Sequence, residues 1–168
     1  MVGDLSRQSL KQLLQLNGAI VAELKRRGVC RTSNSPIGDI AEHLFSNAFG
    51  WQLESNSKAG FDALDDLGQK YQIKSRRVSA GNQSRQAGDI RRLKDGLFDF
   101  VAGVVFSEEC DVLLGLIIPH RLVAERASEI SHSNSSRIYL RDDWVDTPGV
   151  RNVTGELREE WERLNKAA

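Results

Sequence analysis

The sequence predicts an α/β domain with a central mixed β-sheet flanked by helices and an added N-terminal helix. Three observations lead to this fold class. Apolar residues recur with a helical period over residues 5–27 and 37–49. The period changes to two over residues 51–78, and two nearly continuous apolar runs follow at 98–106 and 112–118. A chain of 168 residues fits one such domain.

The two N-terminal helices have clear ends. The first is expected over residues 5–27, since Lys25, Arg26 and Arg27 suit the negative end of a helix dipole and Gly28 is a typical stop. In the second helix, Ser35 is expected to cap the first turn, which contains Pro36, and Gly50 to end the helix. At about 100° per residue, Glu42 lies at the edge of its apolar stripe, and Asp39 lies on the solvent side.

The middle of the chain predicts a meander of three strands. Residues 51–54, 61–64 and 70–78 are expected as strands, with a turn at 65–68 between the last two. Residues 79–88 contain no apolar side chain larger than alanine, so a mobile loop is expected there. A short helix containing Ile90 and Leu93 should follow.

The remaining elements complete the sheet and its cover. The runs at 98–106 and 112–118 are typical of strands that are buried on both faces. Pro119 is expected to open a helix that continues to residue 127. An edge strand at 137–140 and a final helix at 156–164 follow. We therefore divide the chain into an N-terminal helix and linker (1–34), a core (35–127) and a C-terminal extension packed on that core (128–168).

The charge is balanced overall but unevenly distributed. There are 23 basic and 23 acidic residues, which argues against a polybasic binder. Residues 70–94 nevertheless carry eight basic side chains and one acidic one, a local charge of +7. Such a band suits a polyanion, although a solvated charged face is the alternative explanation.

Several other classes of function lack support in the sequence. Neither a phosphate-binding loop nor a dinucleotide-binding glycine motif is present, so no nucleotide cofactor is expected. The three histidines show no metal-binding spacing. The two cysteines allow one disulfide but no disulfide framework. The absence of a secretory signal and of a long apolar run predicts a cytoplasmic protein without membrane contact.

The candidate chemistry lies in the meander. Side chains alternate between the faces of a strand, so Gln72, Lys74 and Arg76 point away from the core side of the third strand. A register that pairs the apolar residues of the two strands places Asp62 beside Gln72 and Lys74. The alternative explanation for Asp62 and Lys74 is a plain cross-strand ion pair.

These residue types fit phosphodiester hydrolysis. A hard cation such as Mg²⁺, or Mn²⁺ in its place, prefers oxygen ligands. The Asp62 carboxylate, the Gln72 amide and the Ile73 backbone carbonyl can supply them. Lys74 can orient the attacking water and neutralise charge on the phosphate. Glu42 can add a further ligand, or it can be an ordinary surface glutamate.

Nucleic-acid contacts are expected along and after the third strand. Arginine and amide side chains of the kind that contact phosphates and base edges follow Lys74. The candidates are Arg76, Arg77, Asn82, Arg85, Gln86, Arg91 and Arg92.

The sequence resembles a known nuclease superfamily at these positions. Glu42 in GDIAEHL, Asp62 after Gly60-Phe61, and Tyr71-Gln72-Ile73-Lys74 resemble the helix-Glu, Asp and (E/Q)xK elements of the PD-(D/E)xK, restriction-endonuclease-like superfamily. The order of helix, meander, helix and strand over residues 35–118 is similar too. Gln72 stands where Asp or Glu is commonest, as in the QxK variant of Mrr-type restriction endonucleases.

The resemblance implies a restriction-endonuclease-like core and a Mg²⁺-dependent DNA endonuclease in restriction, defence or repair. Asp62, Gln72, Lys74 and Glu42 would then be catalytic, and Asp62, Gln72, Ile73 and Glu42 would hold the metal. A catalytically inactive nucleic-acid-binding or assembly module on the same fold is the first alternative, and a plain interaction protein that uses the first helix is the second. The apolar stripe of that helix also predicts a homodimer.

Overall fold

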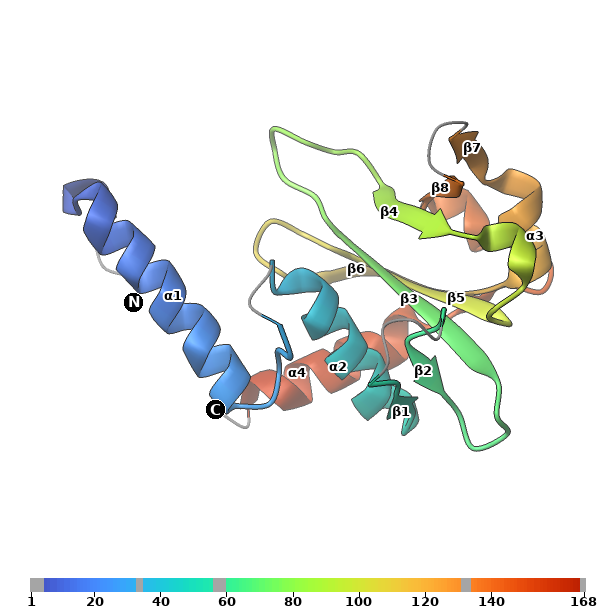
Figure 1. The fold of residues 1–168 in the computed structure, drawn as a ribbon, viewed down its shortest axis with the longest axis horizontal. Coiled ribbons are helices and arrows are strands. Elements are labelled where there is room, and N and C mark those ends of the chain that lie inside the picture. Colours follow the sequence, from blue (N-terminus) through green and yellow to red (C-terminus); the bar gives the residue numbers. More distant parts are fainter. Residues whose placement is uncertain (1–4, 33–34, 56–59, 131–133, 167–168) are drawn as a thin grey trace.

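The structure is a computed structural model that describes residues 5–32, 35–55, 60–130 and 134–166. The helices and strands are shown in Figure 1. In chain order they are α1 (Leu10–Arg26), α2 (Ile37–Phe49), β1 (Gln52–Leu53), β2 (Ala63–Leu64), β3 (Lys70–Arg77), β4 (Gln86–Arg91), β5 (Phe100–Phe106), β6 (Val112–Pro119), α3 (His120–Arg126), β7 (Ser128–Ile130), β8 (Ser135–Tyr139), β9 (Arg151–Asn152) and α4 (Thr154–Lys166).

The central sheet is mixed, as predicted. Its strand order is β1-β2-β3-β5-β6-β9. Strand β3 runs parallel to β5, and the other neighbours are antiparallel. Ala63 of β2 pairs with Tyr71 of β3, which is the register expected from the apolar residues. The apolar runs of β5 and β6 occupy the middle of the sheet, as expected for strands that are covered on both faces.

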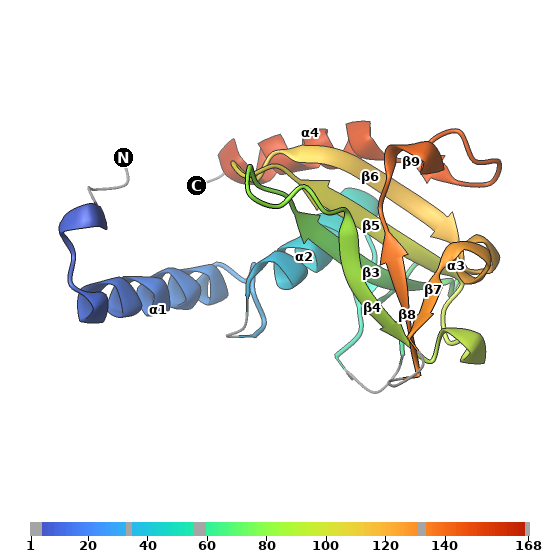
Figure 2. The ribbon, with the colours of Figure 1, turned by 90° about the horizontal axis from the view of Figure 1, so that it is seen from above.

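The two faces of the central sheet are covered differently. Helices α2 and α4 pack on one face, where a chain of stacked rings leads from Phe45 through Trp51 and Tyr71 to Phe100. The other face is covered by α3 and by a second sheet of order β4-β8-β7 (Figure 2). Gly103 of β5 allows the closest approach, because a methyl group at that position would overlap the Leu140 side chain after β8.

The second sheet corrects two predictions. The segment expected as a loop at 79–88 turns at Ser79 and Asn82, and then enters β4 at Gln86. Ile90 lies in β4 rather than in a helix, and the only helical turn nearby is the 3-10 turn Leu93–Asp95. The pairing of β4 with β8 shifts between Gln86 and Asp89. This irregularity breaks the alternation that identifies a strand, so the pattern of apolar residues was misleading.

The C-terminal part corrects one further prediction. The expected edge strand at 137–140 is instead Ser135–Tyr139, and it lies between β4 and β7. Its serines 135 and 136 are buried, which a pattern of apolar residues does not reveal. The final helix agrees with the prediction but is longer, Thr154–Lys166. Cys30 and Cys110 are free, so the disulfide that the sequence allows is not formed.

Helix α1 extends away from the rest of the molecule (Figures 1 and 2). It begins at Leu10 rather than at residue 5, because Ser9 and Gln12 form a reciprocal capping box; a separate 3-10 turn covers Leu5–Arg7. No residue of α1 is buried. Helix α2 is capped at Pro36 rather than Ser35, and Gly50 ends it with a φ of 70°. No helix within the described ranges is long and apolar enough to cross a membrane.

Candidate functional site

A cleft of about 490 Å³ separates the meander from β4. Its walls come from two sheets, because β2 and β3 belong to the central sheet and β4 belongs to the second one. The lining residues are Gly60, Phe61, Asp62, Gln72 and Lys74 on one side, and Asp89, Arg91, Arg92 and Leu97 on the other. The structure therefore brings together three of the four predicted catalytic residues, Asp62, Gln72 and Lys74.

Asp62 lies just before β2 and is still hydrogen-bonded to β3. Its backbone N–H donates to the Tyr71 carbonyl at 2.8 Å, which continues the antiparallel pairing. Its carboxylate oxygen Oδ2 accepts from the Ile73 backbone N–H at 2.6 Å and from the Gln72 side-chain amide. Burial raises the pKa of the Asp62 carboxyl, and these hydrogen bonds together with the positive charge of Lys74 oppose that shift.

Lys74 is a half-buried cation. Burial lowers the pKa of its ammonium group, while the negative charges of Asp62, Glu42 and Asp89 raise it. Within the described parts of the chain, Lys74 forms no ion pair within 4.0 Å, so its charge is shared among three carboxylates rather than held by one. The alternative explanation of a plain Asp62–Lys74 ion pair therefore does not describe this site.

Glu42 approaches the same group of charges from α2. Its carboxylate pairs with the Arg31 guanidinium, and Arg31 also donates to the Glu54 carbonyl at 2.8 Å. Burial raises the pKa of Glu42, and the Arg31 charge acts in the opposite direction. Glu42 is thus close enough to influence Asp62 and Lys74, although it does not line the cleft itself.

Arg31 is a site residue that the sequence analysis missed. The linker before α2 is held by Asp39, whose carboxylate accepts the backbone N–H groups of Arg31 and Thr32 at 2.9 and 2.7 Å. Asp39 was expected on the solvent side of the helix, and there it anchors this linker. Arg31 precedes Glu42 by 11 residues in an irregular segment, so no periodic pattern connects the two.

Asp89 is the second residue that was missed. It alternates with the buried Ile90 on β4 and so faces the cleft together with Arg91. Its carboxylate also pairs with Arg137 of β8 at 3.3 Å. Because the irregular pairing of β4 hides the strand in the sequence, no available pattern placed Asp89 opposite Lys74.

The residues present can hold a hard cation. The Ile73 N–H bonds to Asp62, and the N–H and C=O groups of one strand residue point to the same side, so the Ile73 carbonyl faces the same gap. A half-turn of the Gln72 amide places its oxygen where its nitrogen now meets Asp62. No group of three or more His, Cys, Asp or Glu side chains in the described ranges could hold a metal ion. A cation here would therefore depend on Asp62, the Gln72 amide and the Ile73 carbonyl, with Glu42 nearby.

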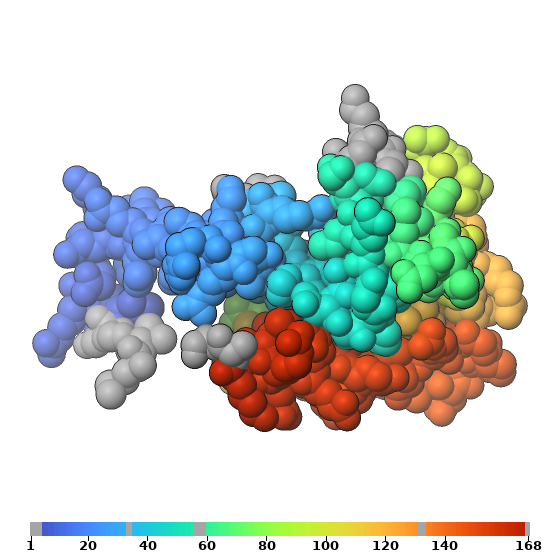
Figure 3. All heavy atoms as spheres, turned by 90° about the horizontal axis from the view of Figure 1, so that it is seen from below, coloured from blue at the N-terminus to red at the C-terminus, as the bar shows by residue number. Residues whose placement is uncertain are grey.

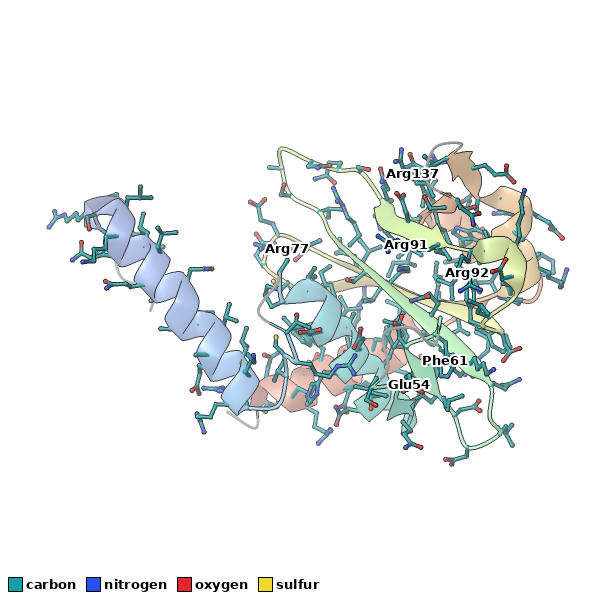
Figure 4. All side chains as sticks on the ribbon, viewed as in Figure 1. Glu54, Phe61, Arg77, Arg91, Arg92 and Arg137 are labelled. Atoms are coloured by element: carbon teal, nitrogen blue, oxygen red, sulfur yellow. The ribbon has the colours of Figure 1, made fainter. Side chains whose placement is uncertain are left out.

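The predicted nucleic-acid contacts separate into two groups. Arg91 and Arg92 line the cleft, and Figure 4 shows them together at one end of β4, whereas Arg77 lies at the far end of β3. The others lie outside the cleft lining. Their contacts are Arg76 with the Ser84 carbonyl, Arg77 with the Glu108 carbonyl, Arg85 with Asp142, and Asn82 with the Ser84 N–H, while Gln86 opens β4.

No protein-family model and no curated protein matches this sequence.

Proposed function

We propose that this protein is a metal-dependent nuclease that hydrolyses phosphodiester bonds in DNA. The observation that carries the proposal is the convergence of a carboxylate, an amide and a half-buried lysine on one cleft, supplied by adjacent strands of a meander. The resemblance to PD-(D/E)xK nucleases supports the proposal. The order of elements supports it too, because α2 is followed by the meander of β1, β2 and β3, and β5 then pairs in parallel with β3.

Each residue has a distinct task in this proposal. A bound divalent cation would polarise the scissile phosphate and lower the pKa of a water molecule. Asp62, the Gln72 amide oxygen and the Ile73 carbonyl would hold it. Lys74 would orient the water and stabilise negative charge that develops on the phosphate, where burial strengthens the interaction. Arg91 and Arg92 would bind flanking phosphates from the opposite wall.

Two features differ from the pattern of the superfamily. The connection from β3 to β5 contains β4 and a 3-10 turn where the resemblance predicts a helix. Gln72 supplies a neutral ligand where an acid is commonest, which removes one negative charge from the cation site. We expect the second difference to weaken cation binding and to favour Mn²⁺ over Mg²⁺.

Cleavage of supercoiled plasmid DNA with Mg²⁺ or Mn²⁺ tests the proposal. The unmodified protein should nick or linearise the plasmid, and EDTA should stop the reaction. Asp62→Asn and Lys74→Ala should each abolish cleavage. Lys94→Ala is the matched control, because Lys94 is an exposed lysine outside the cleft that pairs with Glu129. Parent-like cleavage by Lys74→Ala would refute the catalytic assignment.

A second candidate function is a nucleic-acid-binding module without cleavage. It is favoured by Gln72 and by the pairing of Glu42 with Arg31, because both reduce the negative charge that is free to bind a cation. DNA retardation at low salt that depends on Arg91 and Arg92, with no cleavage in either metal, would support this candidate over the nuclease.

A further inference from the structure

Most of the apolar surface of helix α1 is left uncovered by the residues that the structure describes, and only near its end does Leu24 line a cavity together with Ile40 of α2 and Trp161 of α4. The helix has 17 residues, and none of them is buried. Leu10, Leu14 and Ile20 are 75%, 64% and 51% exposed. Figure 3 shows the helix projecting from the body of the molecule. An isolated helix of about this length is only marginally stable in water, so contact with another surface would stabilise it.

The apolar residues of α1 follow the spacing of a coiled-coil seam. Leu10, Leu13, Asn17, Ile20 and Leu24 are separated alternately by three and four residues. This spacing places them along one side of the helix and extends almost from its first turn to its last. We call these five residues the α1 seam. Leu14 and Val21 lie beside it and widen the apolar surface.

Asn17 indicates which partner fits the seam. It stands at the middle position, seven residues from Leu10 and seven from Leu24. A foreign apolar groove would bury this amide without a hydrogen-bond partner, which is costly. A second copy of the same seam, aligned in register, places Asn17 opposite Asn17, and each amide can then donate to and accept from the other. One polar residue in a seam is also known to fix register and oligomeric state.

We propose that α1 is a dimerisation helix whose seam pairs with the seam of a second copy of this chain, with Asn17 facing its counterpart. The dimer buries the apolar surfaces of two α1 helices. Both clefts lie in the parts of the two chains that follow α1, so they stay outside the dimer interface. This inference does not depend on the nuclease proposal, since it concerns an element that is separate from the cleft.

Sedimentation of the full chain tests the pairing. The unmodified protein should have the mass of two chains at micromolar concentration. Ile20→Glu and Leu14→Glu should raise the dimer dissociation constant by about a hundredfold or more, because each carboxylate enters a symmetric apolar interface twice. Gln15→Glu is the matched control on the opposite side of the helix, and it should leave the dimer intact.

Cross-linking tests the register. Asn17→Cys should form an intermolecular disulfide readily under mild oxidation, because residue 17 faces its own copy whichever way the two helices run. Gln15→Cys should not form one. Cys110 is replaced by serine in both variants, and the buried Cys30 is retained. The proposal would be overturned if the unmodified protein still sedimented as a monomer at 100 times the concentration of the sedimentation experiment. Equal cross-linking of Asn17→Cys and Gln15→Cys would overturn it too.

Discussion

At the scale of single residues, the charges around Lys74 determine what the cleft can bind. Three carboxylates and three cations influence one another there. Arg31 pairs with Glu42, the negative charges of Asp62, Glu42 and Asp89 act on Lys74, and Arg91 repels Lys74. A divalent cation that enters this group must compete with Arg31 for Glu42. In the proposed nuclease, Arg31 would therefore oppose cation binding, because it pairs with Glu42 and repels positive charge.

Arg31→Ala should raise the affinity for Mn²⁺ about threefold to tenfold, which corresponds to roughly 0.7–1.4 kcal/mol. The reason is that the substitution removes a positive charge and frees the Glu42 carboxylate. Isothermal titration of the metal measures the change. Arg27→Ala is the control, because Arg27 pairs with Glu23 on α1. Weaker metal binding by Arg31→Ala would show that Arg31 organises the site instead of competing for it.

Metal affinity should weaken as the pH falls, because Asp62 and Glu42 have raised pKa values. Burial raises the pKa values of Asp62 and Glu42, so protons compete with the cation at a higher pH than for exposed carboxyl groups. Folding favours their protonated forms, so the stability that these two groups contribute is present at low pH and is lost as the pH rises through their folded-state pKa values. When Mn²⁺ is titrated at pH values from 8 down to 4, its affinity should begin to fall at a pH above the usual carboxyl pKa of about 4. A fall confined to lower pH would contradict this prediction.

The sequence was informative about some of these residues and silent about others. Asp62, Gln72 and Lys74 could be placed together because a period of two and a short hairpin are local properties of the chain. Arg31 and Asp89 could not be placed, because their positions depend on a linker held by Asp39 and on an irregular strand pairing. Both are consequences of tertiary contacts that leave no repeating pattern.

At the scale of elements, the cleft depends on how closely the second sheet packs on the central one. Gly103 of β5 lies against Leu140, which follows β8, and β8 pairs with β4. This contact therefore sets the distance between Asp89 and Arg91 on one wall and Lys74 on the other. The apolar run of β5 predicted that this strand is buried. Gly103 within the run did not indicate which part of the chain packs against it.

Gly103→Ala should lower the free energy of unfolding by about 1–3 kcal/mol, because the added methyl group overlaps Leu140. Chemical denaturation measures the change. Gly81→Ala is the matched control, since a methyl group there meets no atom within 4 Å and its φ is not in the left-handed region. Equal effects of the two substitutions would show that the sheets adjust without cost.

The cleft residue Arg91 should contribute to nucleic-acid affinity. If Arg91 meets a phosphate, Arg91→Ala lowers the slope of log affinity against log salt by about one. Arg77→Ala should leave the slope nearly unchanged, because Arg77 lies away from the cleft and donates to the Glu108 carbonyl. Fluorescence anisotropy with a DNA duplex over a salt series measures both variants. Identical slopes for the parent and Arg91→Ala would remove Arg91 from the interface.

At the scale of the whole molecule, cation binding should be coupled to folding. The proposed ligands come from β3 and from the residue before β2, so they are assembled only in the folded chain. Mn²⁺ should therefore raise the thermal midpoint of unfolding. At a free Mn²⁺ concentration of a hundred times its dissociation constant, the free energy of unfolding should increase by about 2.7 kcal/mol. Differential scanning fluorimetry with and without EDTA measures this shift. Asp62→Asn should remove it, whereas a shift retained in that variant would place the cation elsewhere.

The stacked rings behind β3 give the molecule an intrinsic optical probe. Trp51 and Tyr71 lie with their ring centroids 3.8 Å apart and nearly parallel, and Tyr71 is the neighbour of Gln72 on the strand. Electronic transitions of rings at this separation couple, so this pair contributes a signal to the near-ultraviolet circular dichroism spectrum. Any displacement of β3 by an occupant of the cleft changes the geometry of the pair. The chain can therefore report on its own cleft without an attached dye.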